Sequence, residues 1–116
     1  MAYEGVKPLD LTDRLAAVTT LFEAHNEAPF PSRWRGADVA GFDMVMLDAD
    51  PAGCVSVWLK RQGLLDDWRW NVLAVECEQR LIRVILELDA HGREYYQRLL
   101  DMTVLLLDAD RPQRQH

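Results

Sequence analysis

The sequence predicts an all-α fold, an antiparallel bundle of four to five helices. Three observations lead to this prediction: apolar residues recur at helical spacing along most of the chain, capping residues precede these stretches, and prolines or glycines separate them. With 116 residues, of which 49% are hydrophobic and 28% charged, the chain has the size and composition of one globular domain. We expect residues 1–9 to form an N-terminal extension and residues 111–116 a disordered polar tail.

The first helix is expected in DLTDRLAAVTTLFEAHN, residues 10–26. Asp10 or Thr12 can cap its start, and Pro29 ends it. The loop EAPFPSRWRG follows, recognisable by its prolines and its glycine.

Two arginines flank a tryptophan in this loop. Arg33, Trp34 and Arg35 together could bind an acidic group and stack on an aromatic ring, so they form a candidate partner-binding loop. The alternative, which the abundance of acidic residues favours, is that Trp34 packs under the end of the bundle while both arginines form ion pairs.

The second helix is expected to begin in ADVAGFDMVMLDAD, residues 37–50, where Val39 and Phe42 fall on one helical stripe. Because proline cannot donate a backbone hydrogen bond inside a helix, we expect this helix to be kinked or broken at Asp50-Pro51. Asp50 would then cap a new helix that continues to Gly63. A mixed helix-and-sheet structure is the alternative for residues 42–60, where β-branched residues are common.

The third helix, which begins near Asp66, carries two apolar faces. One contains Trp70, Leu73, Cys77, Leu81, Val84 and Leu88, and the other contains Trp68, Val72, Val75, Ile82 and Leu86. A surface helix of a small monomer needs only one apolar face. The second face therefore predicts either a helix at the centre of the domain or a homodimer interface, and we favour the dimer.

The last helix is expected to follow the capping residue Asp89 and to carry a broad apolar arc that includes Tyr95 and Tyr96. If this arc faces the earlier helices, an aromatic cavity between helices could bind a small molecule. The candidate residues of that pocket are Phe42, Trp70, Tyr95 and Tyr96.

No catalytic or metal-binding motif is found in the sequence. The histidines are scattered, the two cysteines lack the Cys-x-x-Cys spacing of a zinc site, and no serine lies in a nucleophile motif. Asp48 and Asp50 would point to different sides of a helix, so we expect Asp48 to be solvated and predict no metal or cofactor. An enzyme using Asp43, Asp48 or Asp50 is the third possibility, after a binding protein of either kind.

The net charge and the absence of long apolar runs argue against two further classes of protein. A net charge of −6 disfavours nucleic-acid binding, and the apolar runs are too short to span a membrane. No signal peptide is evident and the cysteines do not form a disulfide framework, so a cytoplasmic location is expected. The sequence thus predicts a non-catalytic protein-interaction or regulatory module, with a small-molecule-binding bundle as the alternative.

Overall fold

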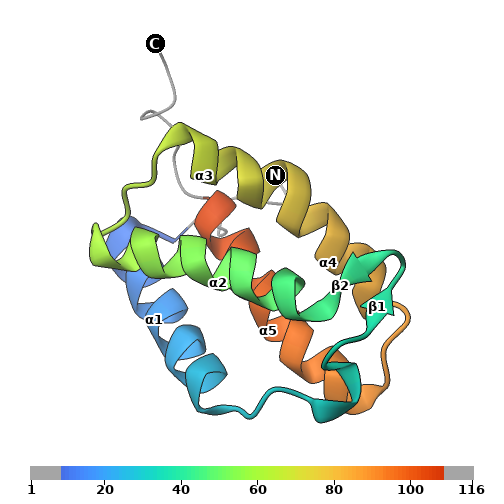
Figure 1. Ribbon diagram of the computed structural model, residues 1–116. Coiled ribbons are helices and arrows are strands. Elements are labelled where there is room, and N and C mark those ends of the chain that lie inside the picture. Colours follow the sequence, from blue (N-terminus) through green and yellow to red (C-terminus); the bar gives the residue numbers. More distant parts are fainter. Residues whose placement is uncertain (1–8, 109–116) are drawn as a thin grey trace, which may run out of the picture.

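The computed structural model describes residues 9–108 of the chain, and these residues are mainly helical (Figure 1). The helical class predicted from the sequence is therefore confirmed. The expected tail at residues 111–116 and all but the last residue of the expected N-terminal extension lie outside the described residues. The regular elements are α1 (Leu11–Glu27), η1 (Ser32–Trp34), β1 (Asp38–Val39), β2 (Phe42–Asp43), α2 (Met44–Lys60), α3 (Asp67–Asn71), η2 (Val72–Cys77), α4 (Glu78–Ile85) and α5 (Ala90–Leu107).

Three of these elements form one long helix. The α3 segment continues without interruption into η2, a stretch of π-helix, and then into α4, so we call residues 67–85 the α3–α4 helix. In the described part of the chain there are thus four long helices. Helix α5 packs against α1, α2 and the α3–α4 helix, which places it at the centre of the fold. Its buried side chains include Tyr96, Leu99, Met102 and Leu106.

Asp43 rather than Asp50 begins the second long helix. The Oδ1 atom of Asp43 accepts hydrogen bonds from the backbone N–H groups of Val45, at 2.9 Å, and Met46, at 3.1 Å. Residues 38–43, which were expected to be helical, instead form a two-stranded hairpin in which Val39 pairs with Phe42. Ala40 and Gly41 connect the strands with φ angles of 53° and 85°, the left-handed conformation that a tight two-residue turn requires.

The prediction that the helix is broken at Asp50-Pro51 is wrong, whereas a kink there stays a prediction. Helix α2 runs through Pro51, which is buried within it. Proline lacks an N–H, so the carbonyl of Leu47 loses its usual partner in the helix. Burial of Leu47, Cys54, Val55 and Trp58 along one side of the helix offsets that loss, because helical stability in proteins comes mostly from tertiary packing. The helix ends as expected before Gly63, whose N–H donates to the carbonyl of Trp58 at 2.8 Å.

Asp66 caps the α3–α4 helix and pairs with Arg69. Its Oδ2 atom accepts from the Arg69 backbone N–H at 3.3 Å, and its Oδ1 atom accepts from Arg69 Nη1 at 2.7 Å. Partial burial raises the pKa of the Asp66 carboxyl, but the hydrogen bonds from Arg69 outweigh this effect and hold the pKa below its ordinary value.

We expect the stabilising effect of Asp66 to depend on pH. Because its pKa is lower in the folded chain, the ionised carboxylate stabilises the fold above about pH 4, and the contribution is lost as the pH falls through the folded-state pKa. Asp66→Asn keeps a capping oxygen but removes the charge. It should lower the free energy of unfolding by up to about 1 kcal/mol at neutral pH and by much less at about pH 2.5. Urea unfolding at both pH values measures this difference, with Asp38→Asn as the control. An equal loss at the two pH values would contradict the role assigned to the charge.

Candidate functional site

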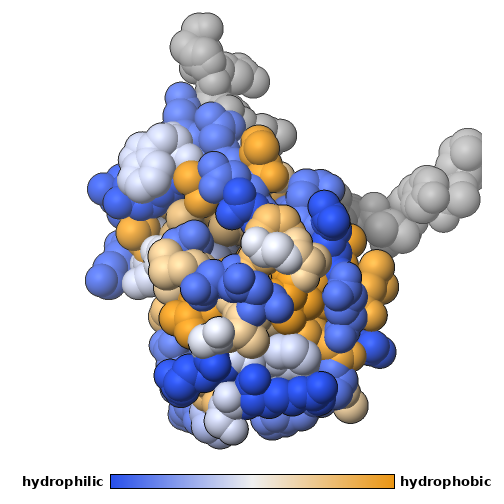
Figure 2. Space-filling view, turned by 45° about the vertical axis from the view of Figure 1, so that its right-hand side comes forward, coloured by the Kyte–Doolittle hydropathy of each residue, from blue (hydrophilic) through white to orange (hydrophobic). Residues whose placement is uncertain are grey.

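The second apolar face of the α3–α4 helix lies on the surface. Trp68, Val75, Ile82 and Leu86 are 62%, 67%, 44% and 77% exposed, while Val72 is half-buried. We call these five residues the exposed stripe. The helix is therefore not the central one, a place that α5 takes, and most of its second face is exposed. Figure 2, which brings the α4 side of Figure 1 forward, shows hydrophobic residues reaching the surface between hydrophilic ones.

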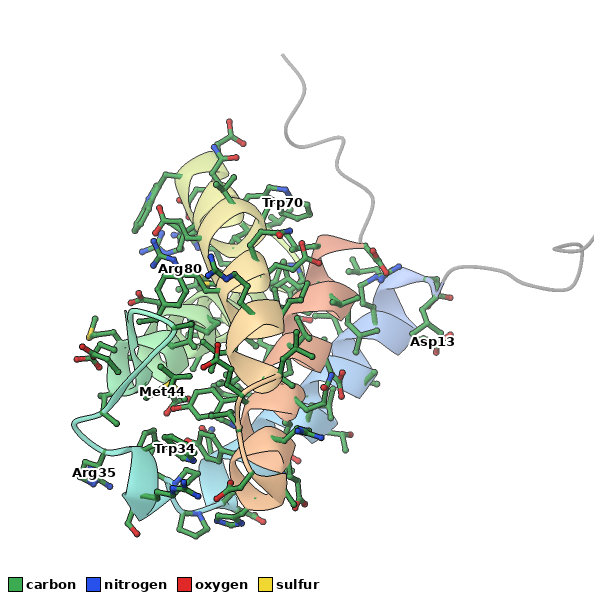
Figure 3. The ribbon with its side chains drawn as sticks, turned by 90° about the vertical axis from the view of Figure 1, so that its right-hand side faces the viewer. Asp13, Trp34, Arg35, Met44, Trp70 and Arg80 are labelled. Carbon is green, nitrogen blue, oxygen red and sulfur yellow. The ribbon has the colours of Figure 1, made fainter. Side chains whose placement is uncertain are left out.

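A groove follows the contact between α2 and the α3–α4 helix. It consists of two hollows of about 370 and 440 Å³, both lined by Asp50. The larger hollow includes Trp68 and Val72 of the exposed stripe, and the smaller one includes Phe42 and Arg80. Figure 3 shows Arg80 on the hairpin side of the helix, and its guanidinium stacks over the Phe42 ring at 5.1 Å.

Both cysteines lie at this groove, one in each hollow, and neither forms a disulfide. Burial raises the pKa of the Cys54 thiol and raises that of Cys77 to about 12. Thiols with raised pKa values are almost fully protonated at neutral pH and therefore weak nucleophiles. Both thiols pack within the hydrophobic core.

The arginine–tryptophan loop is attached to the start of α5. Arg33 stacks over the Trp34 ring at 4.7 Å and donates to the Asp89 carboxylate at 2.7 Å. The half-buried Trp34 packs against Gly92 in the first turn of α5 (Figure 3). Arg35 is exposed and stacks over Phe30 at 5.1 Å. Most of this arrangement agrees with the alternative interpretation of the sequence, in which the tryptophan packs under the end of the fold and the arginines pair with acidic residues.

The four aromatic residues proposed for a pocket do not line one cavity in the described part of the chain. Tyr95 and Tyr96 are neighbours, with ring centroids 5.2 Å apart. Trp70 and Tyr96 are completely buried, whereas Phe42 lines the groove beside Arg80. The structure thus brings the two tyrosines together, while Phe42 lines the groove.

A buried polar cluster, which the sequence did not reveal, joins three helices. Asp48 of α2 contacts His25 Nε2 of α1 at 2.7 Å through Oδ1 and accepts from the Tyr95 hydroxyl of α5 at 2.9 Å through Oδ2. The His25 and Tyr95 rings lie 4.5 Å apart, and His25 is only 4% exposed. The expectation that Asp48 is solvated is therefore wrong, because both of its oxygens are occupied.

The hydrogen bonds of the cluster link α1, α2 and α5. Burial, followed by the hydrogen bond to Asp48, raises the pKa of Tyr95, so its hydroxyl remains a neutral donor at physiological pH. Burial likewise raises the pKa of Tyr96, whose hydroxyl donates to the Met44 carbonyl at 2.7 Å. His25 Nδ1 has no hydrogen-bond partner among the described residues. Among the described residues, the side chains that hydrogen-bond to Asp48 are those of His25 and Tyr95.

The sequence could not have shown this cluster, because its members are 23 and 47 residues apart and share no motif. Between residues 9 and 108, no three His, Cys, Asp or Glu side chains are grouped closely enough to hold a metal ion. None of the helices in the same range combines the length and apolarity needed to cross a membrane. In comparisons with known proteins, no family model, curated protein or solved structure matched this chain.

Proposed function

We propose that this protein is a non-catalytic interaction module that pairs with a second copy of itself through the exposed stripe. The observation that carries the proposal is the exposure of the stripe on a helix that already buries another apolar face. Val75 and Leu86 leave 67% and 77% of their surface in solvent. A run of large apolar side chains along one exposed helix is typical of an interaction surface.

The spacing of the stripe supports an antiparallel pairing of two identical helices. Trp68 and Leu86 are the same number of residues from position 77 along the chain, and so are Val72 and Ile82. A two-fold axis beside position 77 would therefore place Trp68 next to Leu86 of the second copy and Val72 next to Ile82 of the second copy. Such an interface uses the same patch twice, as two-fold symmetric dimers do.

The charges beside the stripe fit the same register. Glu76 would lie within one helical turn of Arg80 of the second copy, and Glu87 within one turn of Arg69 of the second copy. Opposite charges along the edge of an interface favour the matching register and disfavour others. Within one copy, Glu76 and Arg80 already approach to 3.8 Å, so these side chains can exchange partners without large movements.

Trp68 is the expected anchor of the interface. It is exposed, it borders the groove on α2, and Arg69 stacks over its ring at 4.6 Å. Tryptophan and arginine are the side chains that most often dominate binding energy at protein interfaces. The cytoplasmic location is part of the same proposal, because two free, buried thiols suit a reducing compartment.

We expect light scattering to give a mass of twice 13.4 kDa at about 100 μM protein. Val75→Glu places a charge in the middle of the stripe and should weaken dimerisation at least tenfold, which corresponds to about 1.4 kcal/mol. Leu64→Glu is the matched control, because Leu64 is 60% exposed but lies outside the stripe. A wild-type mass of 13.4 kDa, or a dimer that tolerates Val75→Glu as well as Leu64→Glu, would overturn the proposal.

A further inference from the structure

Arg98 carries an enclosed hydrogen-bond donor without an acceptor. Its Nη1 atom is shielded from solvent and has no hydrogen-bond partner among the described residues. Its Nη2 atom lies 3.9 Å from Glu94 Oε2, which is longer than a hydrogen bond. A guanidinium nitrogen that is enclosed but unpaired is costly, so such a group normally binds a ligand or water.

A small cavity lies beside this side chain. It has a volume of about 80 Å³ and is lined by Ala28 and Pro29 at the end of α1 and by His91, Glu94, Tyr95 and Arg98 of α5. A water molecule occupies about 30 Å³ in the liquid, so the cavity has room for a few waters or for one small ligand. The hydroxyl of Tyr95, which also lines the cavity, is already bound to Asp48.

The unpaired guanidinium of Arg98 favours an anion, and the negative charges nearby restrict that anion to a low charge. Arg98 and Arg35 act on Tyr95 as nearby positive charges, and Asp48 acts on it more strongly as a negative charge. The Asp48 carboxylate near Tyr95 is already occupied by His25 and the Tyr95 hydroxyl. Glu94, whose side chain is 76% exposed, adds one negative charge at the rim and would repel a dianion such as phosphate.

We propose that this cavity binds a small monocarboxylate through Arg98. A planar carboxylate matches the fork of donors on a guanidinium, and Ala28, Pro29 and the Tyr95 ring offer an apolar wall for a short alkyl group. The ligand class is thus a carboxylate of acetate size. This site is separate from the exposed stripe and does not depend on the dimer.

Acetate is the probe for this proposal, titrated at constant ionic strength into isotopically labelled protein. We expect saturable NMR shift changes at Ala28, Gly92 and Tyr95, with a Kd on the order of 1–10 mM. Arg98→Gln should weaken binding at least tenfold. Arg83→Gln removes the same charge at an exposed position and should change the Kd less than twofold.

A second variant keeps the proposal testable if Arg98→Gln folds poorly. Ala28→Leu fills the cavity without changing any charge, and the extended backbone at Ala28, with φ −78° and ψ 134°, accepts any side chain other than proline without strain. It should abolish acetate binding while leaving the thermal midpoint near that of the wild type. Shift changes that do not saturate, unchanged binding in both variants, or tighter binding of phosphate than of acetate would overturn the proposal. The first of these results would mean that the cavity holds only water.

Discussion

Asp48→Ala is expected to lower the free energy of unfolding by about 2–4 kcal/mol, because it leaves two buried groups unpaired. The Asp48 carboxylate is the partner of both His25 Nε2 and the Tyr95 hydroxyl, and the three side chains come from three different helices. Losing a hydrogen-bond partner in a buried position costs more than the hydrogen bond itself contributes. Urea unfolding measures the loss.

Asp50→Ala is the matched control, two residues away on the same helix. Asp50 is exposed and lines the groove on the other side of α2, so its removal should change the free energy of unfolding by less than about 0.5 kcal/mol. Equal effects of the two substitutions would show that the cluster does not stabilise the fold.

Asp48→Asn tests whether His25 in the cluster is neutral or charged. An amide oxygen can accept from the Tyr95 hydroxyl while the amide N–H donates to a neutral His25, so Asn can satisfy both partners. A loss well below that of Asp48→Ala would indicate a neutral His25. A loss as large as that of Asp48→Ala would indicate a charged histidine that requires a carboxylate.

The helices were predictable from the sequence because their signals are local. Asp10, Asp66 and Asp89 accept hydrogen bonds from backbone N–H groups at the starts of α1, α3 and α5. The buried face of the α3–α4 helix, from Trp70 to Leu88, also follows the predicted spacing. Caps and periodicity depend on residues three or four positions apart, and a single sequence contains that information.

The hairpin and the course of α2 were not predictable by the same means. Val39 and Phe42 have helical spacing, but they are also the paired residues of a two-residue hairpin, and the left-handed Ala40 decides between the two. Pro51 predicts a break when only local preference is considered. The burial of Leu47, which precedes Pro51, and of Trp58, which follows it, overrides that preference.

The exposed stripe could be predicted from the sequence, whereas the polar cluster could not. The stripe lies on one helix, so its five residues could be named from the sequence, although the dimer remains a prediction. The cluster needs three helices to be docked before His25, Asp48 and Tyr95 meet. The cavity beside Arg98 likewise could not be predicted, because it forms between the end of α1 and helix α5.

Gly92→Ala is expected to destabilise the fold, although the same change in an exposed helix usually stabilises it. A Cβ atom at Gly92 would lie 2.5 Å from Trp34 Nε1 and 3.1 Å from Asp89 Oδ1. Trp34 must then move, and Arg33, which stacks on it and pairs with Asp89, must move with it. We expect a loss of about 1–3 kcal/mol in the free energy of unfolding, as is typical of overpacking.

Gly53→Ala is expected to stabilise the fold, in contrast to Gly92→Ala. Gly53 is exposed in α2, and a Cβ atom there would meet nothing within 4 Å. The substitution should therefore stabilise the chain by about 0.5–1 kcal/mol through helix propensity alone. Comparing the two variants by urea unfolding separates the contact with Trp34 from the general preference of helices for alanine.

A double-mutant cycle identifies the contact that makes Gly92 necessary. In a Trp34→Leu background the indole is absent, so adding Gly92→Ala should cost at least 1 kcal/mol less than it does in the wild type, a coupling within the range of contacting residues. Independent, additive effects of the two substitutions would mean that the strain lies elsewhere, for instance at the cap formed by Asp89. The coupling thus tests whether the arginine–tryptophan loop is held in place by α5, which is what the ion pair between Arg33 and Asp89 indicates.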